Sequence, residues 1–182
     1  MRDILGGKGA NLAEMSGIGI PVPPGFTVST DACNIYTSSG NTITEEIQKE
    51  ILENLSKLEN ASGQKLGDKE NPLLVSVRSG AKFSMPGMMD TILNLGLNDT
   101  TVESLAKKSG VRRFALDCYR RLIHMFGDVV LGISKKEFET ILKTIKYNAG
   151  VVNDYDLTEK HLEKIISEYR TLVQKETGKD FP

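Results

Sequence analysis

The sequence predicts an α+β protein built from two parts, a small α/β subdomain over residues 1–97 and an all-helical subdomain over residues 98–182. Short apolar runs that are typical of strands occur only in the first part, at Gly25–Ser29, Leu73–Arg78 and Thr91–Leu97. From residue 98 onward four helical patterns follow one another and no strand pattern appears. A short sheet followed by a run of helices is the element order of an α+β fold.

Composition excludes several classes of protein. The chain has 182 residues, a hydrophobic fraction of 39% and a net charge of -1, so we expect a soluble globular protein that binds neither nucleic acid nor a membrane surface. No apolar run approaches the roughly 18 residues that cross a bilayer, and the N-terminus lacks the apolar core of a signal peptide. These features predict a cytoplasmic protein.

Cysteine and histidine give no sign of a metal site. Cys33 and Cys118 lie far apart without a CxxC spacing, so we expect two buried free thiols. His124 and His161 fall in helical patterns with no neighbouring ligand set, which indicates ordinary helix positions. We expect no metal ligand and no catalytic residue in this chain.

The segment Leu5–Met15 is a glycine-rich turn that leads directly into a helical pattern, with the sequence LGGKGANLAEM. Its glycines let the backbone approach a ligand closely, and the N–H groups of the following helix favour an anion. Lys8 adds a full positive charge. The spacing differs from that of the common P-loop, which has four residues between its glycines and Ser or Thr after the lysine. The turn therefore predicts a phosphate site, and the alternative is a plain helix entry with a solvated lysine.

Three prolines between residues 21 and 24 predict an extended passage into a short strand at Gly25–Ser29. Thr30 or Asp31 is expected to cap a brief helix that runs to Tyr36.

A long amphipathic helix follows, opened by a capping box at Thr42 and Glu45. Its apolar stripe, which we expect to pack in the core, consists of Ile43, Ile47, Ile51, Leu55 and Leu58. A loop over residues 60–72 then leads to Leu73–Arg78, a strand apolar enough to be buried on both faces.

The segment Arg78–Asp90 between the last two strands is too long for a tight turn and contains small residues, two positive charges and three methionines. Such a segment suits the wrapping of a ligand. Arg78 offers a planar, permanently charged fork suited to phosphate. The alternative is an ion pair between Arg78 and a structural carboxylate such as Asp90.

Capping boxes are expected to open three of the four C-terminal helices, at Thr100/Glu103, Ser134/Glu137 and Asp156/Glu159. The remaining helix, from Val111 toward Val130, has an apolar face formed by Phe114, Ala115, Cys118, Leu122, Met125, Phe126 and Val129. Together the four helices are similar to a small bundle.

The C-terminal part is mildly basic. It carries 15 basic and 13 acidic residues, whereas residues 1–97 carry 8 and 11. Four arginines cluster on one helix, at Arg112, Arg113, Arg120 and Arg121. We interpret them as a solvated face, with a docking surface for an acidic partner as the alternative.

Four segments in this order resemble the N-terminal nucleotide-binding domain of the pyruvate phosphate dikinase family: Gly6–Met15, Pro21–Phe26, Leu74–Gly80 and Met85–Leu97. The resemblance covers nearly the whole chain, and the last segment favours this family over phosphoenolpyruvate synthase and the glucan dikinases. It implies an ATP-grasp fold in which Lys8 and Arg78 bind the phosphates of ATP and in which Gly87 and Met89 line the same cleft.

The resemblance also implies an activity. Members of the family interconvert ATP, pyruvate and phosphate with AMP, phosphoenolpyruvate and diphosphate, using magnesium and a phosphohistidine. Neither His124 nor His161 lies in a sequence similar to the family's phosphohistidine motif. The segments that supply the magnesium ligands, the phosphohistidine and the pyruvate site also have no counterpart here.

We therefore expect an incomplete ATP-grasp domain, a truncated fragment inactive by itself. Its partners would be ATP and the remainder of a dikinase, which is expected to be a homo-oligomer. The alternatives are a non-catalytic or partner-binding module without ATP turnover and a relative of phosphoenolpyruvate synthase.

Overall fold

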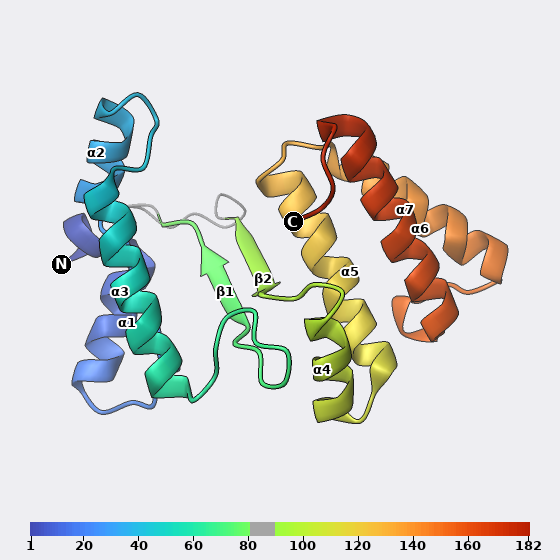
Figure 1. Cartoon of the computed structure of the whole chain (residues 1–182), viewed down its shortest axis with the longest axis horizontal. Coiled ribbons are helices and arrows are strands. Elements are labelled where there is room, and N and C mark those ends of the chain that lie inside the picture. Colours follow the sequence, from blue (N-terminus) through green and yellow to red (C-terminus); the bar gives the residue numbers. More distant parts are fainter. Residues whose placement is uncertain (81–89) are drawn as a thin grey trace. The chain divides into compact units, whose positions relative to one another are not determined.

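The structure is a computed structural model that describes residues 1–80 and 90–182. Figure 1 labels its helices and strands: α1 (Arg2–Gly17), α2 (Thr30–Ser38), α3 (Glu45–Ser62), β1 (Val75–Arg78), β2 (Thr91–Leu95), α4 (Thr101–Ser109), α5 (Arg112–Val129), α6 (Lys135–Ala149), the 3₁₀-helix η1 (Asp154–Asp156) and α7 (Glu159–Thr177). Seven α-helices and a two-stranded antiparallel sheet in the described residues confirm the α+β class. In these residues no helix combines the length and apolar character needed to cross a membrane.

The chain forms two compact units. The first consists of Met1–Gln64 and Arg78–Asp90, and the second of Lys65–Val77 and Thr91–Pro182. The chain therefore passes from one unit to the other three times. The division into subdomains at residue 97 stays a prediction.

In the first unit, the helix caps differ from those that the sequence predicts. The side chain of Ser29 caps α2, because its Oγ accepts a hydrogen bond from the N–H of Ala32 at 3.3 Å. Thr44, two residues after the predicted cap, caps α3 by accepting from the N–H of Ile47 at 3.4 Å. In both cases the capping oxygen belongs to the residue directly before the first helical residue, where it reaches the unpaired N–H groups.

Two other predictions for the first unit are wrong. Residues Gly25–Ser29 form no strand. The apolar stripe of α3 is not a core, since Ile43 is 55% exposed and its other members are only half-buried. Periodicity shows that a helix has an apolar face, but it does not show what covers that face.

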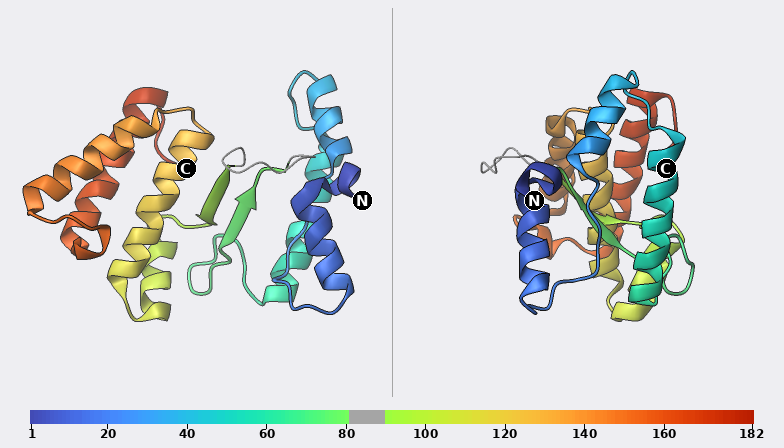
Figure 2. Two further views of the ribbon diagram at one scale, coloured as in Figure 1. Left: turned by 180° about the vertical axis from the view of Figure 1, so that it is seen from behind. Right: turned by 90° about the vertical axis from the view of Figure 1, so that its left-hand side faces the viewer.

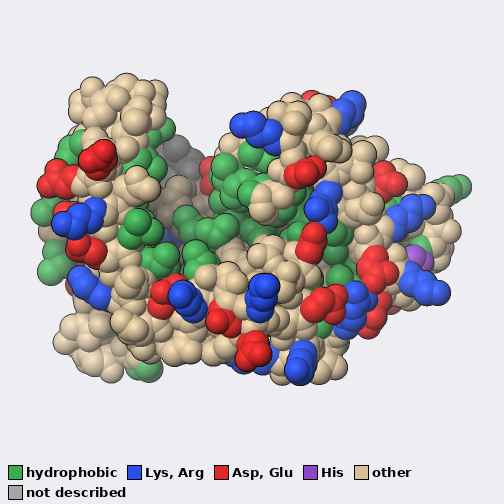
Figure 3. Space-filling view, viewed as in Figure 1, with side chains coloured by type: hydrophobic (Ala, Val, Ile, Leu, Met, Phe, Trp, Pro, Cys, Tyr) green, Lys and Arg blue, Asp and Glu red, His purple; other side chains and the backbone are tan. Residues whose placement is uncertain are grey.

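Among the residues of α1, α2 and α3, only Gly6 and Ala10 are buried. Apolar side chains are accordingly visible on the surface of this unit in Figure 3. The first unit thus buries little apolar surface in the part of the chain that the structure describes.

The two strands pair as an antiparallel hairpin. The prediction of a strand buried on both faces is wrong for β1, whose last three residues are exposed, although Leu73 just before it is buried. Ile92 of β2 is buried and belongs to the main core cluster. After β2 the chain turns at Gly96, with φ of 114°, where a Cβ atom would lie 2.5 Å from the carbonyl oxygen of Leu73. Only glycine fits this position.

The four C-terminal helices that the sequence predicts are confirmed as α4 to α7. Helix α5 is the centre of this unit and packs on β2, α4, α6 and α7, while α7 also packs on α6 (Figures 1 and 2). The predicted apolar face of α5 is wrong in part, because Phe114 and Val129 are exposed and Leu116, Tyr119 and Ile123 are buried instead. Since α5 has neighbours on several sides, its buried surface is wider than one stripe.

The caps of α4, α6 and α7 also differ from the predicted boxes. Ser134 precedes α6, but its side chain forms no capping hydrogen bond. The carboxamide oxygen of Asn98 accepts from the N–H groups of Thr100 and Thr101, both at 2.9 Å. The fully buried hydroxyl of Thr101 donates to the carbonyl of Gly96 at 2.8 Å, which fixes the connection from β2 to α4. Thr158 opens α7 in a capping box.

Candidate functional site

The glycine-rich turn lies inside α1, which is broken at Gly6. This residue is buried and has φ of 68° and ψ of 173°, a conformation that is essentially restricted to glycine. Gly7 and Lys8 therefore begin a new helical segment that continues to Gly17. The first N–H groups of such a segment have no acceptor within the helix, and they carry the positive end of its dipole.

Lys8 is half-buried at the start of this helical segment. Within residues 1–80 and 90–182, no hydrogen bond or ion pair involves its ammonium group. The positive charge of Lys8 is therefore not neutralised by a neighbouring carboxylate of the described structure.

Residues at and just before the start of α2 contact the turn. The hydroxyl of Thr30 donates a hydrogen bond to the carbonyl of Asp3 at 2.7 Å. On the other side of the break, a Cβ atom added to Gly9 would lie 3.1 Å from Cγ2 of Thr27 and 3.1 Å from Cβ of Leu5. Close packing thus accounts for the glycine at position 9, and backbone conformation accounts for that at position 6.

Arg78 is the last residue of β1 and is exposed. Directly after it, Ser79 donates two hydrogen bonds to the carbonyl of Asp90, from its N–H at 3.0 Å and from its hydroxyl at 3.3 Å. The side chains of Arg78 and Asp90 form no ion pair, and Arg78 has no other ionic partner among the residues that the structure describes. Within the described residues, the guanidinium group of Arg78 is therefore not engaged by another side chain.

Of the four nucleotide-binding residues that the sequence predicts, the structure describes two, Lys8 and Arg78. Lys8 and Arg78 belong to the same compact unit, with no hydrogen bond between them. Gly87 and Met89 lie outside the described residues. The contacts of Thr27 with Gly9 and of Thr30 with Asp3 were not predicted, because nothing in the sequence pattern connects residues this far apart in the chain.

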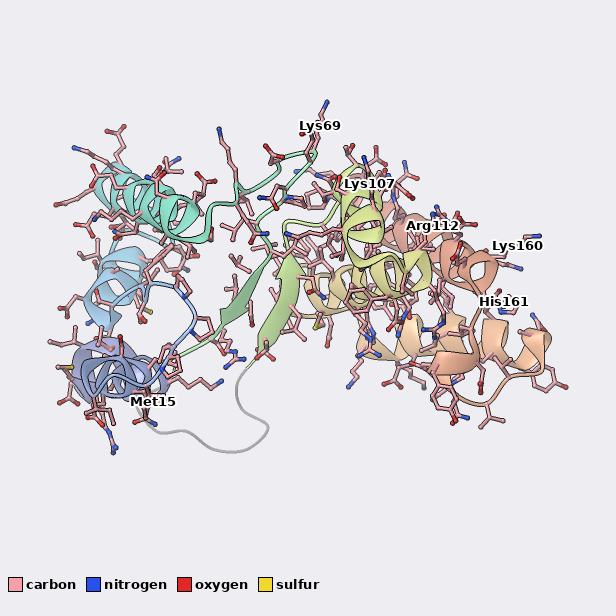
Figure 4. The ribbon with its side chains drawn as sticks, turned by 90° about the horizontal axis from the view of Figure 1, so that it is seen from below. Met15, Lys69, Lys107, Arg112, Lys160 and His161 are labelled. Carbon is pink, nitrogen blue, oxygen red and sulfur yellow. The ribbon has the colours of Figure 1, made fainter. Side chains whose placement is uncertain are left out.

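The arginines of the second unit differ from Arg78, because all five have partners. Arg112, labelled in Figure 4 at the start of α5, lies 2.8 Å from Glu103 of α4 and 2.6 Å from Glu163 of α7. Arg121 forms an ion pair with Asp117. Arg113 donates two hydrogen bonds, both to backbone carbonyls.

Arg120 corrects the interpretation of the four clustered arginines as a solvated face. It is only 3% exposed and lies 2.6 Å from Asp117 and 3.3 Å from Asp154. A hydrogen bond from Lys146 holds the pKa of Asp154 below its ordinary value, and the charge of Arg120 adds to this effect. Asp117, one turn before Arg120, is the signal that could have indicated a buried pair.

A shallow groove in the second unit lies between α4, α5 and α7, and its lining includes Asp99, Arg112, Tyr119 and Arg170. Arg170 donates to both carboxylate oxygens of Asp99, at 2.9 and 2.8 Å. Because carboxylates of the protein already engage both arginines, this groove offers an anionic ligand no unpaired guanidinium group.

The cysteines and histidines have ordinary roles. Cys118 is half-buried and Cys33 is exposed, so the prediction of two buried thiols is wrong for Cys33, although both are free. His161, in the first turn of α7 (Figure 4), accepts from the N–H of Thr158. His124 stacks on Phe138 at 5.0 Å between ring centroids. In the described residues no group of three or more His, Cys, Asp or Glu side chains could hold a metal ion.

Comparison with known proteins identifies relatives along the whole chain. It is 54% identical over 183 residues to pyruvate, phosphate dikinase of Clostridium symbiosum, 52% over 182 residues to chloroplastic pyruvate, phosphate dikinase 1 of Arabidopsis thaliana and 48% over 181 residues to the dikinase of Rhizobium meliloti. Each match covers 100% of this chain but only 21%, 19% and 20%, respectively, of the relative. The chain thus spans about a fifth of the length of these relatives.

A family model described as the AMP/ATP-binding domain of pyruvate phosphate dikinase matches residues 2–60 and 40–125. These ranges include the broken helix α1 with Lys8 and the end of β1 with Arg78. The chain belongs to the pyruvate phosphate dikinase family.

Proposed function

We propose that the first unit binds the polyphosphate of ATP through Lys8 and Arg78. The observation that carries this proposal is the pair of cationic side chains, at a helix start and at a strand end, that have no carboxylate partner in the described residues. Both lie in one compact unit and in the ranges that match the AMP/ATP-binding family model.

The two side chains suit different parts of this task. The ammonium group of Lys8 is a compact charge beside helix N–H groups, and the guanidinium group of Arg78 can donate two parallel hydrogen bonds to phosphate oxygens. Phosphoryl transfer depends mainly on positioning and on charge stabilisation, which these groups provide. We propose in addition that the unit is part of an ATP-grasp fold and that Gly87 and Met89 line the same cleft.

At the level of the whole protein, we propose a dikinase that converts ATP, pyruvate and phosphate to AMP, phosphoenolpyruvate and diphosphate through a phosphohistidine outside this chain. Magnesium would accompany ATP, and its carboxylate ligands would come from outside this chain. The proposal includes a homo-oligomer, a cytoplasmic location and the remaining dikinase domains as partners. It includes no catalytic residue in residues 1–182.

The alternative of a module that docks an acidic partner through its arginines has less support. Arg112, Arg120 and Arg121 are engaged by carboxylates, and Arg113 by backbone carbonyls. An acidic partner would have to compete with these internal partners.

The decisive experiment uses a dikinase that contains this chain and measures phosphohistidine formation separately from ATP and from phosphoenolpyruvate. Lys8→Ala and Arg78→Ala should each abolish labelling from ATP and leave labelling from phosphoenolpyruvate intact, because only the first reaction uses this site. The matched controls are Lys49→Ala, an exposed lysine in the same unit, and Arg2→Ala. Equal loss of both labelling reactions would refute the assignment.

For the 182-residue chain alone we expect weak ATP binding and no turnover, because the magnesium ligands and the opposite wall of the cleft would be missing. Calorimetric titration with ATP and magnesium measures this affinity. A micromolar dissociation constant would contradict the expectation and show that these residues form a complete site.

A further inference from the structure

Two threonines hold the lysine turn from opposite sides of the break in α1. Thr30 donates a hydrogen bond to the carbonyl of Asp3, three residues before Gly6. Thr27 lies against Gly9, three residues after Gly6, where its Cγ2 atom would be 3.1 Å from an added Cβ atom. Thr27 lies in the segment that leads into α2, Thr30 is the first residue of α2, and α2 packs on α1. One short stretch of chain therefore contacts the turn before and after Lys8.

The turn depends on such outside support. Three of the four residues from Gly6 to Gly9 are glycines, and glycine loses the most conformational freedom on ordering. A ligand that had to order this turn on binding would bind less tightly than one that met it already ordered. Glycine adopts the φ of 68° and ψ of 173° of Gly6 without strain, but a free glycine backbone also populates many other conformations.

We propose that Thr30 and Thr27 are positioning residues for ATP: they hold the Gly6–Gly9 turn in the conformation in which Lys8 and the helix N–H groups meet the polyphosphate. They act through the turn and do not touch the nucleotide. This inference rests on the proposed function of Lys8, and it extends the site to a segment with no charged side chain except Asp31 at the start of α2.

The first test needs no ligand. Thr30→Val keeps the shape of the side chain and removes the hydrogen bond to Asp3. The matched control is Thr37→Val, also on α2, whose hydroxyl bonds the carbonyl of Cys33 within its own helix at 3.0 Å. Amide hydrogen exchange at residues 7–10 should become about three- to tenfold faster in Thr30→Val, as expected for the loss of one hydrogen bond, and stay unchanged in Thr37→Val. Equal exchange in both variants would overturn the inference.

The second test measures ATP binding by NMR titration of the isotope-labelled 182-residue chain, with adenosine as the ligand without phosphate. Thr30→Val should weaken ATP binding about three- to tenfold and leave adenosine binding unchanged. In a Lys8→Ala background, Thr30→Val should cause no further loss, because the threonine acts through the lysine turn. A loss that persists at full size in this background would overturn the positioning role.

The two proposals fail in different ways. If Lys8→Ala itself binds ATP as well as the unchanged chain, the proposed function is wrong, whatever Thr30→Val does. If Lys8→Ala weakens binding and Thr30→Val does not, only the positioning role is wrong.

The contact of Thr27 has its own test. Gly9→Ala should weaken ATP binding, because its new Cβ atom would meet Thr27 at 3.1 Å and push the turn away. Adding Thr27→Ala should restore part of the affinity by giving this atom room. Unchanged affinity in Gly9→Ala would show that ATP binding does not depend on this contact.

Discussion

The two compact units differ in how many side chains they bury and in whether their arginines have partners in the described residues. Every residue of the main core cluster, from Ile92 to Phe181, belongs to the second unit, and all five arginines of that unit have partners. In the helices of the first unit only Gly6 and Ala10 are buried, and Arg78 has no partner in the described residues. The main core cluster and the arginine without a partner in the described residues are thus in different parts of the chain. Binding sites are often carried by the less stable parts of a fold, because these parts can move when a ligand arrives.

The test with the largest expected effect replaces one leucine by alanine in each unit. Leu122→Ala in α5, where the leucine is 1% exposed, should lower the free energy of unfolding by about 2–5 kcal/mol. Leu55→Ala in α3, where the leucine is half-buried, should cost about 1 kcal/mol or less. Urea denaturation followed by circular dichroism measures both values. A cost at Leu55 equal to that at Leu122 would show that the first unit has a core of its own.

A pair of glycines sharpens the comparison, because the same change should have opposite signs. In Gly127→Ala the new Cβ atom would lie 2.3 Å from Cζ of the buried Phe138, and the overpacking should cost about 1–3 kcal/mol. In Gly17→Ala, at the end of α1, nothing lies within 4 Å of the new Cβ atom. The higher helix propensity of alanine should raise the free energy of unfolding by about 1 kcal/mol or less. Thermal melting of the two variants checks both signs. A neutral Gly127→Ala would mean that α5 and α6 can separate at no cost.

The smallest expected effect is a pH dependence in the second unit. Burial lowers the pKa of His124 below its ordinary 6.5, and the nearby charge of Arg120 lowers it further. Asp128, Lys135 and Glu139 also act on this imidazole. At pH values between the lowered pKa and 6.5, the unfolded chain binds more protons at His124 than the folded chain does. The contribution of His124 to the free energy of unfolding is therefore fully present above pH 6.5 and decreases as the pH falls below it.

The measurement is the melting temperature between about pH 7 and pH 5 for the unchanged chain and for His124→Gln, which should lose this part of the dependence. Asp154 and Glu103 have pKa values lowered from 3.8 and 4.5, so their contributions to stability decrease mainly below these ordinary values and change little within this window. An identical decrease in both proteins between pH 7 and pH 5 would exclude His124 as its cause.

How far the sequence predicts the structure also differs between the units. The four C-terminal helices are correct because their apolar residues recur at helical spacing and the resulting faces meet one another. The strand at Gly25–Ser29 is wrong because a short apolar run after prolines fits an unpaired extended segment equally well. The spacing of Asp117 and Arg120 could have indicated one ion pair, but the second partner of Arg120, Asp154, lies 34 residues away, where no local charge spacing indicates it.

For the candidate site, the sequence predicts the residue types but not their support. The glycines, Lys8 and Arg78 form a local pattern that indicates phosphate. The hydrogen bond from Thr30 to Asp3 spans 27 residues and depends on how α2 packs on α1, which no local pattern contains. That Lys8 and Arg78 bind the phosphates of ATP stays a prediction.

The connection from α6 to α7 shows one more consequence of the buried charges. Arg113 donates to the carbonyls of Asp154 and Leu157, both at 2.7 Å, while Arg120 and Lys146 hold the carboxylate of Asp154. A protease must draw several residues of a loop into an extended shape before it can cut, and here that movement would break these bonds together. This connection should therefore resist nicking although it lies at the surface, and its resistance should disappear when either arginine is replaced.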